Sequence, residues 1–189
     1  TEWVISEAFT QAKKWHDAGI QLKISINISA NNLHEPDFVT KTTALLKLHS
    51  VEASWFTLEI TESTIMANPS HSLEILKQLK SMGFSLSVDD FGTGYSSLAY
   101  LREMPVNELK IDQSFIFNLI TNKNNAVIVH STINLAHNLG LTVVAEGVED
   151  KQTFDQLKEL GCDLLQGYCI SRPIPADELI PLLKKYHDN

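Results

Sequence analysis

The stretch VDDFGTGYSSL, residues 88–98, decides how the rest of this sequence is interpreted. It begins where the apolar run Phe84–Val88 ends, passes through two adjacent aspartates and two glycines, and opens a helical pattern at Ser96. Adjacent carboxylates repel each other, and burying them without a counter-charge costs on the order of several kcal/mol, which a divalent cation commonly offsets. Gly92 and Gly94 allow the loop to bend sharply or to close over a ligand. Aspartates before a glycine are also ordinary turn residues, so both interpretations stay open at this point.

Length and composition describe one globular domain. The chain has 189 residues, of which 43% are hydrophobic and 20% charged, as in ordinary soluble proteins. Its formal net charge of -8 argues against binding DNA or RNA through a basic surface, because phosphate neutralisation requires an excess of lysine and arginine. No apolar run reaches the roughly 18 residues of a membrane span, so this segment is expected to make no membrane contact.

Two cysteines, Cys162 and Cys169, are too few for a disulfide framework and lack the spacing of a zinc site. Free thiols are typical of a reducing compartment, so a cytoplasmic location is expected. The chain begins at Thr1 rather than at a methionine, which indicates a piece cut from a longer polypeptide. Whether that longer polypeptide is anchored to a membrane stays open.

The pattern of apolar residues predicts alternating helices and strands. Recurrence at three and four positions predicts helices over Glu2–Ala18, Pro36–His49, Ser70–Met82, Ser96–Glu103, Ser114–Leu139, Lys151–Leu160 and Ala176–Tyr186. The long fifth helix is expected to break near Asn122–Asn125. Short runs rich in branched apolar residues predict strands over Leu22–Ser29, Trp55–Glu62, Phe84–Asp90, Glu108–Asp112, Leu141–Ala145 and Cys162–Gln166.

Such alternation predicts an α/β fold with a parallel sheet and helical crossovers. Each predicted strand ends in polar residues, namely Asn27, Glu59, Asp89 with Asp90, Lys110 with Asp112, Glu146, and Gln166. In a parallel sheet these ends lie at one edge, and in a (β/α) barrel that edge carries the active site. A doubly wound open sheet is the alternative, but it concentrates function at one crevice. Polar residues at every strand end therefore favour a TIM-like (β/α)8 barrel.

The acids at and near these strand ends offer oxygen ligands only. They are the carboxylates of Glu59, Asp89, Asp90, Asp112, Glu146 and Glu149, with the amide of Asn27 beside them. Oxygen ligands suit Mg²⁺ or Mn²⁺ rather than zinc. Two such cations about 3.5 to 4 Å apart can assist an in-line phosphoryl displacement. Lys110 is predicted either to steer a water and offset phosphoryl charge or to neutralise Asp112 or Glu108.

Several other polar residues have a plain structural interpretation beside a functional one. Glu62 is either a solvated cap of the following helix or a functional acid, and Gln166 is either a core amide or a site residue. Arg172 is either an ordinary loop cation or a phosphate contact. His130 and His137, seven residues apart on one helix face, are interpreted as packing or surface residues rather than ligands.

Six ordered motifs along essentially the whole chain resemble the EAL-domain family of cyclic di-GMP phosphodiesterases. They are INIS (26–29), LEITES (58–63), DDFGTGYSSL (89–98), LKID (109–112), AEGVE (145–149) and QGY (166–168). The resemblance implies a (β/α)8 barrel that hydrolyses cyclic di-GMP to linear pGpG with Mg²⁺ or Mn²⁺, two ions being expected. It also implies a homodimer and an upstream sensor or GGDEF-type domain in the parent protein.

The resemblance further implies a role for each matching residue. The implied metal ligands are Asn27, Glu59, Asp89, Asp90 and Glu146. The implied catalytic residues are Lys110, beside the attacking water, and Glu146, with a base role. Asp112, Glu149 and Gln166 are expected to line the substrate pocket. Arg172, outside the six motifs, is added to the expected substrate-binding residues because it follows the last strand and could meet a phosphate. Glu62, with Gly92 and Gly94, is expected to anchor the loop that the family uses to hold metal and to pack dimers.

The sequence departs from the family at one point, because no Glu-Ala-Leu tripeptide occurs in it. In the family that motif lies on a strand upstream of the first helix here, and its glutamate is a metal ligand. A complete barrel has eight strands and about 250 residues. We therefore expect residues 1–189 to be a single EAL-type domain that holds strands 3 to 8 and lacks roughly the first two. In isolation it is expected to have an open sheet edge and to be inactive.

Three function classes remain in view. The first is metal-dependent hydrolysis of cyclic di-GMP by the complete domain. The alternative is a non-hydrolytic cyclic di-GMP receptor that passes a signal to a neighbouring domain. A purely structural dimerisation barrel is disfavoured, because it leaves a costly cluster of acids without a purpose.

Overall fold

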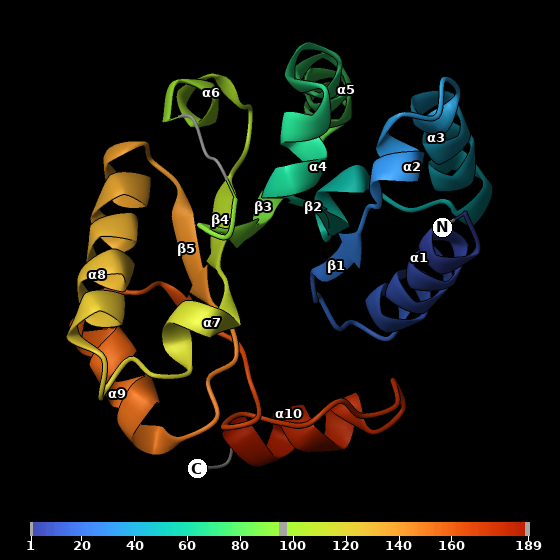
Figure 1. Cartoon of the computed structure of the whole chain (residues 1–189). Helices are drawn as coiled ribbons and strands as arrows, with labels where there is room; N and C mark the ends of the chain where they lie inside the picture. Colours follow the sequence, from blue (N-terminus) through green and yellow to red (C-terminus); the bar gives the residue numbers. More distant parts are fainter. Residues whose placement is uncertain (1, 95–97, 188–189) are drawn as a thin grey trace.

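The computed structural model describes residues 2–94 and 98–187, and it shows one parallel sheet backed by helices (Figure 1). Within those residues the strands are β1 Ile24–Asn27, β2 Phe56–Thr61, β3 Ser85–Phe91, β4 Glu108–Ile111, β5 Thr142–Ala145 and β6 Leu164–Leu165. They lie side by side in chain order, and each neighbouring pair is parallel. A doubly wound sheet would reverse this order at a switch point. The predicted α/β fold with barrel-type winding is therefore confirmed.

Helices connect the strands. In the same described ranges they are α1 Glu2–Asp17, α2 Ala30–Leu33, α3 Phe38–His49, the short 3-10 helix η1 Ala53–Trp55, α4 Glu62–Ala67, α5 Pro69–Ser81, α6 Leu98–Glu103, α7 Gln113–Ile116, α8 Lys123–Asn138, α9 Lys151–Glu159 and α10 Leu179–His187. Every predicted helical segment contains a helix, although the predicted start at Ser96 and Ser97 lies outside the described residues. The break in the long segment is confirmed, since the Asn122 side chain caps α8.

The two faces of the sheet differ in chemistry. Leu58 and Ile60 alternate along β2 with Glu59, and both are almost fully buried in the hydrophobic core. Glu59 and Lys110, by contrast, line the hollow on the inner face of the sheet. The strands of a parallel sheet are commonly apolar on both faces. The charged side chains of Glu59 and Lys110 therefore distinguish the inner face from the apolar core on the other side of the sheet.

Asp163 links the last strand to its neighbours. Its Oδ2 accepts a hydrogen bond from Val143 N–H at 2.7 Å and lies 2.9 Å from His137 Nε2. Burial alone would raise the pKa of Asp163, but these bonds outweigh burial and lower it. Both His137 and His130 are exposed on α8, as predicted for surface residues.

We expect Asp163→Ala to lower the free energy of unfolding by about 1 to 3 kcal/mol at pH 7, because the buried Val143 N–H loses its acceptor. A carboxyl with a lowered pKa stabilises the fold above the ordinary aspartate range, and that effect is lost as pH falls through the folded-state pKa. Urea titrations should therefore show a smaller difference at acidic pH than at neutral pH. Asp155→Ala, which removes an exposed partner of Lys151, should change stability by less than about 0.5 kcal/mol.

Among the residues that the structure describes, no helix combines the length and the apolar character needed to cross a bilayer. This agrees with the absence of a long apolar run in the sequence.

Candidate functional site

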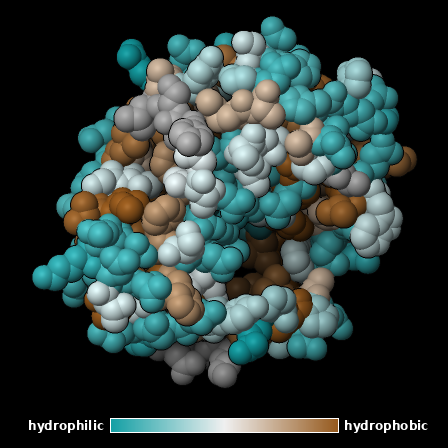
Figure 2. Space-filling model, in the orientation of Figure 1, coloured by the Kyte–Doolittle hydropathy of each residue, from teal (hydrophilic) through white to brown (hydrophobic). Residues whose placement is uncertain are grey.

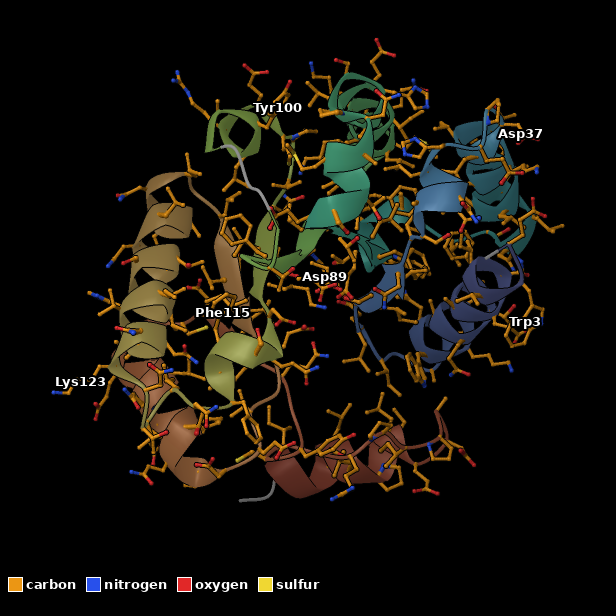
Figure 3. All side chains as sticks on the ribbon, in the orientation of Figure 1. Trp3, Asp37, Asp89, Tyr100, Phe115 and Lys123 are labelled. Carbon is orange, nitrogen blue, oxygen red and sulfur yellow. The ribbon has the colours of Figure 1, made fainter. Side chains whose placement is uncertain are left out.

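Three carboxylates meet at the C-terminal edge of the sheet. Oxygen atoms of Asp89, Asp90 and Glu146 all lie within 4.8 Å of one another. Asp89 and Asp90 belong to β3, while Glu146 follows β5 directly, so a parallel sheet brings them to the same edge. Figure 3 shows Asp89 near the centre of the molecule. The structure thus brings together three of the five predicted metal ligands.

A β-bulge explains how two neighbouring aspartates serve one site. The pairing of β3 with β4 shifts between Val88 and Phe91, which inserts one extra residue. Asp90 has a left-handed backbone with φ of 54°, and its N–H donates to Asp89 Oδ1 at 3.0 Å. In a regular strand successive side chains point to opposite faces. The bulge therefore lets both carboxylates reach the same cluster.

Lys110 joins this cluster to β2. Its Nζ lies 2.9 Å from Glu59 Oε2, 3.2 Å from Asp89 Oδ1 and 2.6 Å from Glu146 Oε1. Burial alone would lower the pKa of Lys110, but the hydrogen bonds and charges of Glu146 and Glu59 outweigh it and raise the pKa. The ammonium group is therefore charged at neutral pH. The predicted alternative partners were wrong, since its ion pairs go to neither Asp112 nor Glu108.

One ammonium does not balance the carboxylates around it. Burial, followed by the charge of Asp89, raises the pKa of Asp90. Burial also raises the pKa of Glu146, although its hydrogen bond with Lys110 opposes the rise. A site with excess negative charge and only oxygen donors fits a divalent cation such as Mg²⁺ or Mn²⁺.

The other two predicted ligands lie on adjacent strands. Asn27 and Glu59 occupy the same register position of β1 and β2. Glu59 is only 6% exposed, whereas Asn27 is exposed. Glu59 lies outside the triad of Asp89, Asp90 and Glu146 and is tied to it through Lys110. The polar set therefore spans β1 to β5.

Glu62 holds the glycine loop. It is the first residue of α4 and only 3% exposed, so the interpretation as a solvated cap was wrong. Its Oε2 accepts a hydrogen bond from Gly92 N–H at 3.0 Å, while a Cβ on Gly94 would lie 3.1 Å from its Oε1. Gly92 has φ of 95°, a conformation that favours glycine. The loop thus wraps closely around this buried carboxylate.

We expect Glu62→Ala to release the loop. Removing the acceptor leaves Gly92 N–H without its partner, which should lower the free energy of unfolding by about 1 to 3 kcal/mol and speed amide exchange at Gly92. Glu62→Gln keeps an acceptor oxygen and should stay closer to the unsubstituted chain. Hydrogen exchange followed by mass spectrometry measures both variants. Equal protection of Gly92 in all three chains would contradict this assignment.

A cavity of about 260 Å³ adjoins the carboxylate triad. Its lining comprises Gln113, Glu146, Gly147, Glu149, Gln166, Gly167 and Tyr168. Glu149 and Gln166 were predicted pocket residues, and Gln166 is exposed, so its alternative as a core amide was wrong. The Arg172 guanidinium lies 4.8 Å from the centre of the Tyr168 ring. Sequence reasoning missed Gln113 and Tyr168 as pocket residues, although Gln113 directly follows a predicted strand and Tyr168 lies two residues beyond one.

Asp112 caps a helix at the border of the site. Its Oδ1 accepts a hydrogen bond from Ser114 N–H at 3.0 Å and so caps α7. It is absent from the lining of the 260 Å³ cavity, but its charge contributes to the raised pKa of Asp90. Asp112 therefore lies at the border of the cluster and affects it through its negative charge.

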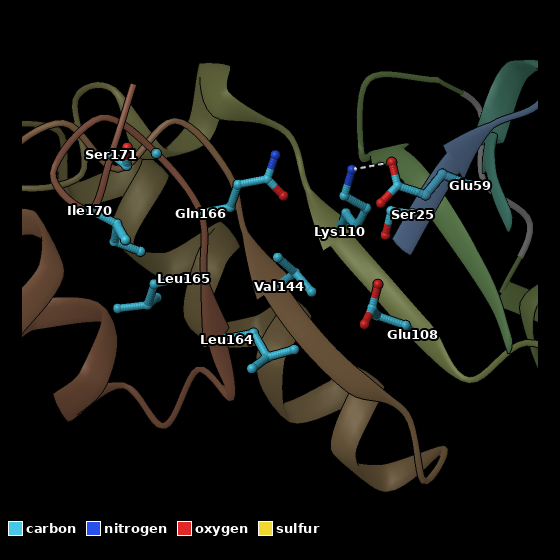
Figure 4. Close-up of a pocket in the computed structure, with 11 residues that line it drawn as sticks. Ser25, Glu59, Glu108, Lys110, Val144, Leu164, Leu165, Gln166, Ile170 and Ser171 are labelled. Atoms are coloured by element: carbon cyan, nitrogen blue, oxygen red, sulfur yellow. Dashed lines mark hydrogen bonds and ion pairs between the residues drawn. The ribbon is translucent and has the colours of Figure 1, made fainter. Parts of the chain in front are cut away.

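A second hollow of about 430 Å³ opens along the inner face of the sheet. Figure 2 shows a recess with hydrophobic residues on its floor, and the apolar lining includes Val144, Leu165 and Ile170. Figure 4 shows Lys110 facing Glu59 on one side of this hollow. The two cavities share Gln166 and Gly167, so they form neighbouring compartments beside the same charged cluster.

Comparison with known proteins gives consistent results. The EAL domain model matches residues 1–173. A bifunctional diguanylate cyclase/cyclic di-GMP phosphodiesterase, MucR of Pseudomonas aeruginosa, is 44% identical over 95% of this chain and 26% of its own length. The cyclic di-GMP phosphodiesterase NbdA of the same organism is 40% identical over 98% of this chain and 24% of its own length. The chain thus spans about a quarter of the length of these relatives.

Solved structures show the same fold. The structure described as PaMucR phosphodiesterase in complex with c-di-GMP superposes with a TM-score of 0.92 at 45% identity, covering 94% of this chain and 72% of that one. The structure of Klebsiella pneumoniae BlrP1 with manganese and c-di-GMP superposes with a TM-score of 0.80 at 31% identity, covering 89% of this chain and 43% of that one. Because the family model matches residues 1–173, nearly the whole sequence, the chain belongs to the EAL domain family.

Proposed function

We propose that this chain carries most of the site of a metal-dependent phosphodiesterase that hydrolyses cyclic di-GMP to linear pGpG. The observation that carries the proposal is the cluster of Asp89, Asp90 and Glu146 around the ammonium group of Lys110. The names of the relatives and the bound ligands of the similar structures support the same reaction and substrate.

The proposed metal ligands are Asn27, Glu59, Asp89, Asp90 and Glu146. Their oxygen donors suit two Mg²⁺ or Mn²⁺ ions, and a similar structure is described with manganese. Two such ions, when bound, lower the pKa of a water and stabilise charge on the phosphoryl oxygens. The protein's part is to hold the ligands in place before the ions arrive.

Lys110 and Glu146 are the proposed catalytic residues. The Lys110 ammonium, held by three carboxylates, can donate a hydrogen bond to an attacking water or to a phosphoryl oxygen. Glu146 has a pKa raised by burial, which suits a group that accepts a proton from water. Their 2.6 Å contact keeps both groups oriented.

The substrate is proposed to lie across both cavities. Carboxylate and amide groups of Glu149 and Gln166 offer acceptors and donors to a nucleobase edge, and Asp112 lies at the border of the site. Arg172, stacked on Tyr168, supplies a cation for a phosphate. Glu62, Gly92 and Gly94 are proposed to hold the loop that follows Asp90 and the end of β3.

A non-hydrolytic cyclic di-GMP receptor is the second candidate. It is supported by the ion pairs of Lys110 with Glu59, Asp89 and Glu146, which hold these side chains as a cradle of defined shape. Such a cradle suits ligand binding without turnover.

We further propose a cytoplasmic homodimer whose parent protein includes a sensor or GGDEF-type domain. The names of MucR, a bifunctional diguanylate cyclase/phosphodiesterase, and of the oxygen sensor DosP of Escherichia coli support an associated domain. The free thiols of Cys162 and Cys169 fit a reducing compartment. Residues 1–189 are proposed to be a single EAL-type domain without its first two strands, inactive by itself.

The deciding experiment measures hydrolysis of cyclic di-GMP by the complete gene product and by this chain alone, with Mg²⁺ or Mn²⁺ and with a chelator. Metal-dependent release of pGpG by the complete product supports the phosphodiesterase. Tight binding without product at any metal concentration overturns it in favour of the receptor. Size-exclusion chromatography with light scattering tests the dimer in the same samples.

A further inference from the structure

The four-residue helix α7 lies between the loops that follow β3 and β5, the strands at whose ends the clustered acids lie. On one side, a Cβ built on Gly92 would lie 3.0 Å from Cε2 of Phe115. On the other side, a Cβ built on Gly147 would lie 2.6 Å from Cβ of Gln113. Gly147 therefore approaches α7 more closely than a larger residue could without a shift, and at Gly92 a larger residue would make a tight contact with the Phe115 ring.

These contacts lie next to the acids in the chain. Gly92 follows Asp90 by two residues, and Gly147 follows Glu146 directly. Both glycines have a left-handed backbone, with φ of 95° and 69°, so each lies at a sharp turn within two residues of its carboxylate. The position of each turn affects where the preceding side chain points.

Several interactions hold α7 itself in place. Asp112 caps it through Ser114 N–H, and the Asn125 side chain on α8 donates to Ser114 O at 3.3 Å. Ile116 is fully buried in the core. Phe115 is half-buried and packs against the same core, so its ring has little freedom to move away from Gly92.

We propose that α7 is the spacer that sets the separation between Asp90 and Glu146, and that Phe115 is a positioning residue for Asp90. Phe115 closes one side of the turn at Gly92, while the hydrogen bond from Gly92 N–H to Glu62 closes the other. Figure 3 labels Phe115 and Asp89, the neighbour of Asp90 in β3. The inference rests on the proposed function in one respect, the role of the carboxylates as metal ligands.

The test compares Phe115→Ala with Phe117→Ala, a matched control whose side chain is 73% exposed just beyond the same helix. Hydrogen exchange of the segment 88–94 is measured without metal, and Mn²⁺ affinity is measured by electron paramagnetic resonance. Phe115→Ala should speed exchange at Gly92 at least about tenfold and weaken Mn²⁺ binding about tenfold, the range typical of residues that orient metal ligands. Phe117→Ala should change the exchange rate at Gly92 and the Mn²⁺ affinity by less than about twofold. Phe115→Tyr, which keeps the ring, should retain the exchange rate and the affinity of the unsubstituted protein.

Unchanged exchange in Phe115→Ala, or equal effects in Phe117→Ala, overturns the inference. So does faster exchange with unchanged Mn²⁺ affinity, because the turn would then not position Asp90. Mn²⁺ affinity is measured in the complete gene product. If that protein without substitutions binds no Mn²⁺, the proposed function fails, while the exchange measurement still decides whether Phe115 holds the turn.

If Phe115→Ala does not fold, a second variant tests the same inference. Gly147→Ala places a Cβ against Gln113 and should weaken Mn²⁺ binding by displacing Glu146. Adding Gln113→Gly to that variant removes the contacting side chain and should recover part of the affinity. Failure of the second substitution to recover any affinity overturns the spacer role of α7.

Discussion

Asp89→Asn is expected to lower the rate of metal-dependent cyclic di-GMP hydrolysis at least about a hundredfold in the complete gene product. Losing a residue that merely orients a metal ligand costs about 10- to 100-fold, and Asp89 is proposed to be a ligand itself. The amide keeps the shape of the side chain but removes one negative charge from the cluster. Metal affinity and turnover should therefore fall together.

The fold should tolerate this change. Lys110 keeps its contacts with Glu59 and Glu146 in Asp89→Asn, so its ammonium stays compensated. Product release is measured by chromatography at several Mn²⁺ concentrations, with thermal unfolding as the check on folding. Asp155→Asn, which changes the same group at an exposed ion pair, is the control. Full activity of Asp89→Asn would remove Asp89 from the proposed site.

Lys110→Met is expected to destabilise the metal-free chain by about 3 to 5 kcal/mol. Lys110 is only 3% exposed, and its removal leaves the carboxylates of Glu59, Asp89 and Glu146 near one another without compensation. Breaking a buried ion pair from one side has a cost of about this size, because a charge stays buried without its partner. Urea unfolding curves of the two chains measure the difference.

Cations should reverse part of this loss. A ligand that binds only the folded state at about 100 times its Kd stabilises by about 2.7 kcal/mol, so Mn²⁺ should protect Lys110→Met against urea. Lys151→Met is the control, because its side chain is 73% exposed and its ion pair with Asp155 contributes at most about 1 kcal/mol. Equal urea midpoints for Lys110→Met and the unsubstituted chain would show that the Lys110 ammonium does not offset the charge of these carboxylates.

The two variants separate chemistry from folding. Asp89→Asn should lose rate while keeping stability, whereas Lys110→Met should lose both. A receptor that uses the same cradle would show the stability loss of Lys110→Met without any rate to lose.

Local patterns were sufficient for the order of the elements. Helices and strands differ in the period of their apolar residues, and that period is written in consecutive residues, so β2 to β5 and the longer helices were predicted within a few positions. The short elements α2, η1 and α4 were missed, because three to six residues are too few to show a period. β6 is also shorter than predicted, with only Leu164 and Leu165 paired.

For the candidate site, too, some features could be predicted from local sequence and others could not. The polar residue at each strand end is a local signal, and a parallel sheet places such ends together, so Asp89, Asp90 and Glu146 could be predicted as neighbours. The partners of Lys110 could not be predicted in this way, since Glu59 lies 51 residues away in the chain. The burial of Glu62 could not be predicted either, because it depends on a loop that begins after β3.

The sequence by itself therefore determined the α/β alternation, the parallel sheet and the acidic edge, because periodicity and strand ends are properties of short segments. Only the tertiary structure decided which charges pair and which residues hold the loops. The bulge at Asp90, the contacts of Lys110 and the fit of Phe115 against Gly92 arise where segments distant in the chain meet. Side-chain contacts across such distances depend on the packing of the whole domain, and no local pattern encodes them.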